Sequence, residues 1–246
     1  MDHAHYEYSA MPFRKKGLLP PGLHLFAVIF LEHWDFQSPA DSVRDPRFVG
    51  EFGSFNPDYR SWTQREYGLR IGVFRLIESL QAHGIRPGVA ANALVLPRVP
   101  TAIAALQGMG AQWIGHGITA TRMMHSRMSV DEQQQHIADS RSAFESTLGL
   151  VPQAWLSQDW GTTEHTWRLL SQAGFRYTLD WGNDDQPYWM KPSDESVKPL
   201  LALPLSSEWD DVQAQWMRHL EPREHAGMIH EAALSLHAES LQMGQG

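Results

Sequence analysis

The amino-acid sequence predicts an α/β fold, an incomplete (β/α) barrel of about six strands that are nearly all joined by helices. Short apolar runs alternate along the chain with longer segments in which apolar residues recur at helical spacing. Several of these longer segments end in glycine, which is a common stop signal for helices. A doubly wound open sheet is the alternative, because parallel strands can also lie flat.

The composition is that of an ordinary soluble globular protein, with 42% apolar and 20% charged residues among 246, and we expect one domain over residues 1–246. The net charge of -8 argues against a nucleic-acid partner, which requires clustered Lys and Arg. The sequence contains no cysteine, so disulfides, thiolate metal sites and cysteine nucleophiles are excluded. The cytoplasm is the expected location.

The apolar run at residues 23–31 is the expected first strand. It is too short to cross a bilayer and lacks the layout of a signal peptide, so no membrane partner is expected. The polar residues 37–61 that follow show little periodicity and are expected to form a long loop. A helix is expected over residues 68–83, where apolar side chains recur at helical spacing before Gly84.

The same alternation continues to the end of the sequence. Ser129 and Glu132 have the spacing of a capping box and predict the start of one of the helices. The expected elements are strand 88–94, helix 100–108, strand 112–115, helix 129–148, strand 154–156, helix 163–173, strands 175–179 and 200–205, and helix 222–240.

Polar side chains follow the carboxyl ends of the expected strands, where parallel α/β folds build their ligand sites. Glu32, His33 and Asp35 follow the first strand, Asn92 lies at the end of the second, and His116 stands between two glycines after the third. A carboxylate there can act as a general base, and His116 can act as a metal ligand, a general acid or an oxyanion stabiliser.

Later strand ends add aromatic and acidic residues, namely Trp155, Asp184, Asp185 and Glu208. Aromatic walls suit a sugar or a heterocycle, although the same residues could simply fill the mouth of a barrel. Histidines on expected helices are more typical of structural or solvated positions; they are His83, His136, His165, His219, His230 and His237. Serine-hydrolase elbows, phosphate-binding loops, H-E-x-x-H zinc motifs and dinucleotide fingerprints do not occur in the sequence.

Several motifs together resemble the polysaccharide deacetylase (NodB-homology) superfamily, and within it the branch of the metal-independent allantoinases. The motifs are Glu32-His33, residues 65–75, Asn92-Ala93, Gly115-His116-Gly117, residues 183–188, and residues 203–205 with Glu208. This resemblance implies a distorted (β/α) barrel of about seven strands, the last of which is expected to be missing from this chain. It also implies a hydrolase of a non-peptide carbon–nitrogen bond, in an N-acetyl sugar or a cyclic amide or ureide.

The resemblance further implies roles for individual residues. Glu32 is expected to be the general base, with His116 and Asn92 polarising the carbonyl group of the substrate. Both His33 and His116 match metal-ligand positions of the metal-dependent members, but Ala120 stands where these members have a second histidine. We therefore expect that no cofactor is required, while a divalent metal such as zinc stays an alternative. The residues expected to bind substrate are Tyr67, Arg70, Trp155, Asp184, Asp185 and Glu208.

Two other interpretations stay open on the sequence. One is a catalytically inactive barrel that binds a carbohydrate or ureide, and the other is a metal-dependent deacetylase with altered ligands. The expected partner is a small molecule or sugar, and a homo-oligomer is compatible with the sequence.

Overall fold

The computed structural model describes residues 4–7, 10, 18–37, 57, 59–192 and 197–244. Its contacts divide the chain into two compact units. One is Phe26–Arg176, and the other, called the terminal unit below, combines Met1–Leu25 with Tyr177–Gly246. The expectation of a single domain stays a prediction.

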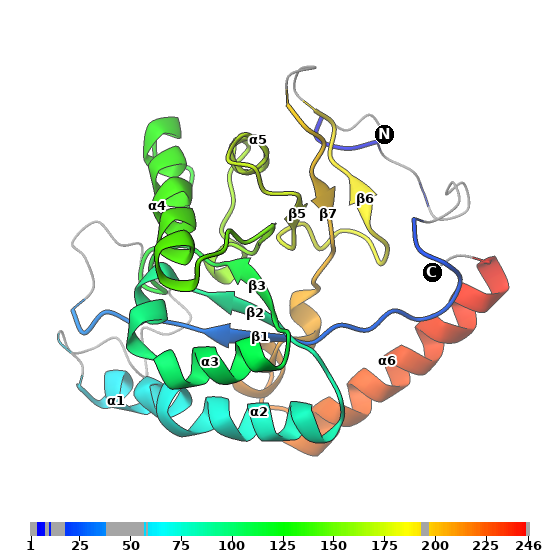
Figure 1. Ribbon diagram of the computed structural model, residues 1–246. Helices are drawn as coiled ribbons and strands as arrows, with labels where there is room; N and C mark the ends of the chain where they lie inside the picture. The colour runs from blue at the N-terminus through cyan, green and yellow to red at the C-terminus, as the bar shows by residue number, and fades with distance from the viewer. Residues whose placement is uncertain are drawn as a thin grey trace. The chain divides into compact units, whose positions relative to one another are not determined.

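Four parallel strands form the sheet of the Phe26–Arg176 unit, in the order β1 (Val28–Leu31), β2 (Gly88–Ala91), β3 (Gln112–Gly115) and β4 (Ala154–Trp155). The first three of these strands are labelled side by side in Figure 1. Their register is level at the carboxyl ends, because Leu31 pairs with Ala91, Ala91 with Gly115, and Gly115 with Trp155. The residues that follow the four strands therefore begin at the same edge of the sheet.

Helices α2 and α3 run along one side of β1 and β2 (Figure 1) and close the main apolar core of this unit. Ile29 and Leu31 of β1 pack there with Ile77 of α2, Leu106 of α3 and Phe144 of α4. Burial of such side chains is the main stabilising contribution to a core of this kind. The helices of the unit are α1 (Tyr59–Tyr67), α2 (Val73–Ala82), α3 (Pro100–Gly108), α4 (Val130–Leu148) and α5 (Thr166–Gln172).

The terminal unit contains β5 (Tyr177–Thr178), β6 (Tyr188–Trp189), β7 (Leu201–Ala202) and the long helix α6 (Pro222–Met243). Strand β7 pairs parallel with β5 and antiparallel with β6. The described residues thus hold seven mostly parallel strands. The α/β class is confirmed, and each of the six strands predicted from the sequence is present, while β6 is a seventh strand that the sequence did not predict.

Helix 100–108 and strand 112–115 are confirmed at their predicted bounds, while most other predicted strands are present but shorter. The helix predicted over residues 68–83 differs more. A π-helical segment, Gly68–Gly72, joins α2 to α1, which begins at Tyr59 inside the predicted loop. Because α1 reads YRSWTQREY, it has no apolar stripe that would predict a helix. Residues 38–56 and 58 of that loop lie outside the described part of the chain.

The predicted capping box opens α4 and can be tested directly. The Ser129 hydroxyl accepts from the Glu132 N–H at 3.2 Å, and the Glu132 carboxylate accepts from the Ser129 N–H at 2.7 Å. Ser129→Ala is expected to lower the free energy of unfolding by about 1 kcal/mol in urea denaturation. Ser146→Ala, on the exposed surface of the same helix, is the control and should change it by less than about 0.5 kcal/mol. Equal effects of the two substitutions would contradict the role of the cap.

None of the described helices combines the length and the apolar composition that a membrane span needs. The cytoplasmic location and a homo-oligomeric state stay predictions.

Candidate active site

Four side chains meet at the carboxyl edge of the Phe26–Arg176 sheet. Glu32, Asn92 and His116 each follow the last residue of β1, β2 and β3, and these last residues are level in the sheet. Gln158 lies three residues beyond the end of β4. The sheet register therefore brings together residues that are up to 126 positions apart in the sequence.

The carboxylate of Glu32 is the centre of this cluster. Its Oε1 atom accepts a hydrogen bond from Gln158 Nε2 at 2.8 Å and lies 3.4 Å from His116 Nε2. Its Oε2 atom accepts from the indole N–H of Trp34 at 3.0 Å. The guanidinium of Arg65 covers the Trp34 ring, 3.1 Å from its centroid. The Glu32 side chain keeps 23% of its surface exposed, so a small molecule can reach a carboxylate that is otherwise held in place.

Burial raises the pKa of Glu32, but the surrounding groups outweigh this effect. Hydrogen bonding to His116 and the positive charge that His116 can carry both stabilise the ionised carboxylate. Hydrogen bonds from Gln158 and Trp34 act in the same direction, and the pKa of Glu32 is lower than that of an ordinary glutamate. Glu32 is therefore ionised at neutral pH and able to accept a proton.

His116 is buried, and its ring orientation follows from one contact. Its Nδ1 atom lies 2.6 Å from the carbonyl oxygen of Leu156. Because a carbonyl oxygen only accepts, Nδ1 must carry a proton. The Nε2 atom is then the one that can gain or lose a proton, and it faces Glu32. This arrangement can hold a proton between the imidazole and the carboxylate.

Asn92 is fully buried and connects the other members of the cluster. Its Oδ1 atom accepts from the backbone N–H of His33 at 3.0 Å, and its Nδ2 atom donates to the His116 carbonyl oxygen at 2.5 Å. The same Nδ2 atom lies 3.4 Å from Gln158 Oε1. These bonds connect the ends of β1, β2 and β3 through Asn92, and its expected role at the substrate carbonyl stays a prediction.

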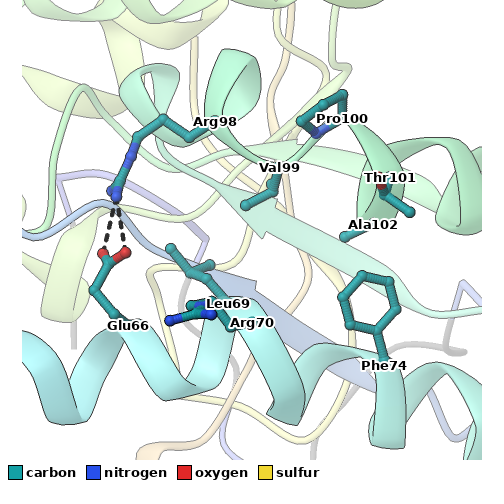
Figure 2. A pocket seen from close by; sticks show the side chains of 9 residues that line it. All are labelled: Glu66, Leu69, Arg70, Phe74, Arg98, Val99, Pro100, Thr101 and Ala102. Atoms are coloured by element: carbon teal, nitrogen blue, oxygen red, sulfur yellow. Dashed lines mark hydrogen bonds and ion pairs between the residues drawn. The ribbon is translucent and has the colours of Figure 1, made fainter.

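His33 belongs to a separate network beside Glu32. Arg98 donates to both carboxylate oxygens of Glu66 at 3.0 and 2.9 Å (Figure 2) and to His33 Nδ1 at 2.7 Å. Because a guanidinium only donates, Nδ1 of His33 must be the acceptor and its proton lies on Nε2. That Nε2 atom lies 3.2 Å from Asp35, whose other oxygen accepts from the Thr119 hydroxyl at 2.9 Å.

These contacts bear on the expected metal ligands, His33 and His116. Both ring nitrogens of His33 are engaged, and a metal needs a nitrogen lone pair. His116 has only Nε2 left, and Ala120 contributes no ligand. Within the described part of the chain, no group of three or more His, Asp or Glu side chains is arranged to hold a metal ion. The residues present therefore do not fit the three-ligand site, because Ala120 replaces one histidine and hydrogen bonds engage both ring nitrogens of His33.

The two histidines are expected to have opposite tautomers, and NMR spectroscopy can detect this. Long-range proton–nitrogen spectra of labelled protein should show the proton of neutral His33 on Nε2, and Nδ1 of His116 protonated. Arg98→Met should remove the preference of His33 while leaving His116 unchanged. A wild-type spectrum with the proton of neutral His33 on Nδ1 would contradict the network.

Arg70, one of the expected substrate residues, lines a pocket of about 200 Å³ together with Glu66 and Arg98 (Figure 2). The lining of this pocket does not include Glu32 or His116. Arg70 thus shares a pocket with Glu66 and Arg98 of the His33 network but not with Glu32.

The other expected substrate residues lie in different surroundings. The Tyr67 hydroxyl accepts from Arg75 on the exposed surface at 2.8 Å. Trp155 is fully buried and donates to the Ser157 hydroxyl at 2.8 Å, so the structure does not expose it to a substrate. Three residues belong to the terminal unit and are not part of the cluster described above: Asp184, Asp185 and Glu208.

Sequence reasoning missed two residues that contact the predicted ones, Gln158 and Arg98, and it read Trp34 only as a strand-end aromatic residue. Gln158 does not titrate in the accessible range, so a search for acids, bases and metal ligands passes over it. Its position was the available signal, since Gln158 follows a predicted strand end. Arg98 carries no comparable signal in the sequence.

No protein-family model matches the chain, and no curated protein matches it either. Its fold is shown by solved structures. A protein assigned as a polysaccharide deacetylase from Mycobacterium smegmatis matches with a TM-score of 0.58 at 24% identity, over 63% of this chain and 53% of that one. A second, from Pseudomonas aeruginosa PAO1, matches with a TM-score of 0.68 at 24% identity, over 76% and 62%. Puue allantoinase matches with a TM-score of 0.69 at 23% identity, over 91% and 78%.

These similarities show that the chain has the NodB-like fold of polysaccharide deacetylases and of Puue allantoinase, as its motifs predicted. They favour the barrel over the doubly wound alternative. The chain spans 53% and 62% of the lengths of the two deacetylases. Activity and substrate are therefore matters for proposal.

Proposed function

We propose that the protein hydrolyses a non-peptide carbon–nitrogen bond, with Glu32 as the general base that activates a water molecule. The observation that carries this proposal is the partly exposed carboxylate of Glu32, 3.4 Å from His116 Nε2 at the carboxyl edge of parallel strands. This edge is where α/β folds place their reacting groups. The fold relatives support the same reaction type, because deacetylases and an allantoinase both break carbon–nitrogen bonds.

The proposed step balances without any group beyond water and the side chains. Glu32 takes a proton from water, and the water oxygen forms a bond to the carbonyl carbon of the amide. When the carbon–nitrogen bond then breaks, the nitrogen takes the proton that Glu32 received from water, either directly or relayed through His116 Nε2, and Glu32 is ionised again. The buried Nδ1 bond of His116 to Leu156 keeps Nε2 directed at the reacting atoms throughout.

The chemistry favours a cyclic amide or ureide over an N-acetyl sugar. The donor set around His33 and His116 does not fit a metal ion that would polarise the carbonyl group. A ureide nitrogen leaves more readily than a simple amine, because its electron pair is delocalised into a second carbonyl. Such a substrate needs less polarisation than an acetamide does.

The rival function is a barrel that binds a ureide or carbohydrate without turnover. The lowered pKa of Glu32 favours this rival, since it makes the carboxylate a weaker base. Tight hydrogen bonding of Glu32 by Gln158 and Trp34 would serve a binding site equally well.

A substrate panel separates these functions. Hydantoins and other cyclic ureides, linear amides and N-acetyl sugars would be incubated with the full chain, with product detection by mass spectrometry and binding measured by calorimetry. We expect ring opening of at least one cyclic ureide. Saturable binding without product would favour the binding protein, and neither product nor binding across the panel would overturn the proposal.

A further inference from the structure

The turn that carries Gln158 is held in an unfavourable backbone conformation. Asp159 and Trp160, the next two residues, have φ values of 48° and 53°, in the left-handed region that side chains with a Cβ atom disfavour. Gly161 closes the turn so tightly that a Cβ atom there would lie 2.8 Å from the carbonyl oxygen of Met124. Strain of this kind concentrates at functional sites, where the surroundings impose it.

This turn directs the Gln158 side chain inward, where it is 9% exposed and its amide has one orientation. Nε2 donates to Glu32 at 2.8 Å, and Oε1 lies 3.4 Å from Asn92 Nδ2. A flipped amide would place its oxygen against the Glu32 carboxylate and its nitrogen against the Asn92 donor, and both contacts would be repulsive. The nitrogen of Gln158 is therefore fixed beside the proposed base.

The donors around Glu32 differ in whether they retain a hydrogen that is not already in a hydrogen bond. Trp34 has one N–H, which Glu32 accepts, and the Nδ2 atom of Asn92 is shared between two acceptors. His116 uses Nδ1 on Leu156. Gln158 Nε2 has two hydrogens, and one of them has no acceptor among the described residues.

We propose that this second N–H of Gln158 binds the carbonyl oxygen of the scissile amide and stabilises the oxyanion that forms when water attacks. The inference rests on the proposed hydrolase function and names a catalytic residue for it. A neutral donor held within 2.8 Å of the base can contact the oxygen of the same carbonyl group whose carbon the activated water attacks. The rigid turn keeps the donor in place before the substrate arrives, so no reorganisation is needed during the reaction.

Gln158→Met is the main test, because it keeps the length of the side chain and removes the donor. We expect kcat on the best ureide of the panel to fall about 10²-fold to 10³-fold, with KM changed only a few-fold. Gln107→Met, on the exposed surface of α3, is the matched control and should leave kcat unchanged. Circular dichroism and thermal melting would establish that both variants are folded.

Gln158→Glu tests the inference through the pH dependence of kcat/KM, which would not change if Gln158 only stabilised the fold. A second carboxylate beside Glu32 should raise the pKa of Glu32, so the acid limb of the kcat/KM profile should move to higher pH. The inference fails if wild type is active and the folded Gln158→Met variant keeps kcat within threefold of it. It also fails if Gln158→Glu leaves the acid limb at the wild-type pH. In both cases the proposed hydrolase function is retained. If wild type hydrolyses nothing in the panel, the proposed function fails and the inference falls with it.

Discussion

Glu32→Gln is expected to lower kcat about 10³-fold, because the amide cannot take a proton from water. The substitution keeps the size and shape of the side chain, and its oxygen can still accept from Trp34 or Gln158. The fold should therefore persist, with a thermal transition close to that of wild type. Steady-state kinetics on the best substrate of the panel, together with thermal melting, measure the two effects separately.

The matched control is Glu78→Gln, which removes an exposed carboxylate on α2. It should leave kcat within twofold of wild type, as expected for a surface charge away from the site. A Glu32→Gln variant that is folded and as active as Glu78→Gln would rule out Glu32 as the base.

The pH profile gives a second check on the same residue. The reaction needs ionised Glu32, so activity should fall as the pH drops through the pKa of this carboxyl. Because hydrogen bonds and the charge of His116 lower that pKa, the loss should occur at lower pH than for an ordinary glutamate. An acid limb at the ordinary value or above it would mean that these bonds do not persist in solution.

The sequence predicted the fold and the central pair well because both depend on simple periodic rules. Apolar runs of strand length and capped helices at regular intervals predict parallel strands, and parallel strands place their following residues at one edge. That rule placed Glu32 and His116 among the candidates, the resemblance assigned their roles, and the structure places their side chains 3.4 Å apart. The register of β1, β2 and β3 positions both residues, so the conformations of the loops did not have to be predicted.

What escaped prediction depends on backbone details that side-chain patterns do not encode. Trp155 follows the same strand-end rule, yet it is the last residue of β4 rather than the first beyond it. A shift of one residue moves a side chain to the opposite face of a sheet, and Trp155 packs into the interior instead. Gln158 reaches Glu32 through a turn with two left-handed residues, neither of which is glycine or asparagine. Aspartate adopts this region more often than most residue types, but tryptophan does not, so the residue types do not predict two left-handed residues in a row.

The π-helical segment Gly68–Gly72 is a second backbone detail that the sequence pattern did not predict. An insertion of one residue per turn changes which side chains face the sheet, and apolar spacing does not report it. Tyr67 and Arg70 were assigned to the substrate from their motif; the structure places Tyr67 on the surface and Arg70 in a neighbouring pocket, and their role stays a prediction.

Gly117→Ala is expected to have the largest effect on stability, lowering the free energy of unfolding by about 3 kcal/mol. Gly117 has a φ of 76°, a conformation that costs alanine energy whatever space surrounds it. An added Cβ atom would also lie 2.7 Å from Nε2 of His136. That ring is buried and packs edge-on against Trp155, so it has little room to move away.

The consequence extends to the site because Gly117 directly follows His116. Its carbonyl oxygen accepts from the Ser140 hydroxyl at 3.2 Å, which ties this turn to α4. Burial, with the nearby charge of Arg122, lowers the pKa of His136 to about 4, so the ring stays neutral above that pH and gains no charge that could draw it toward water. Strain at Gly117 should therefore be relieved by moving the His116 turn, and Gly117→Ala should lose activity as well as stability.

The control is Gly108→Ala at the end of α3, where an added Cβ atom meets nothing within 4 Å. It should be neutral or stabilise the protein by less than about 1 kcal/mol. Adding His136→Ala to Gly117→Ala removes the clash but not the backbone strain, so a double-mutant cycle should show partial recovery relative to the sum of the two single effects. Strictly additive effects would mean that the close approach to His136 contributes nothing, and full stability of Gly117→Ala would mean that the left-handed turn after His116 does not form.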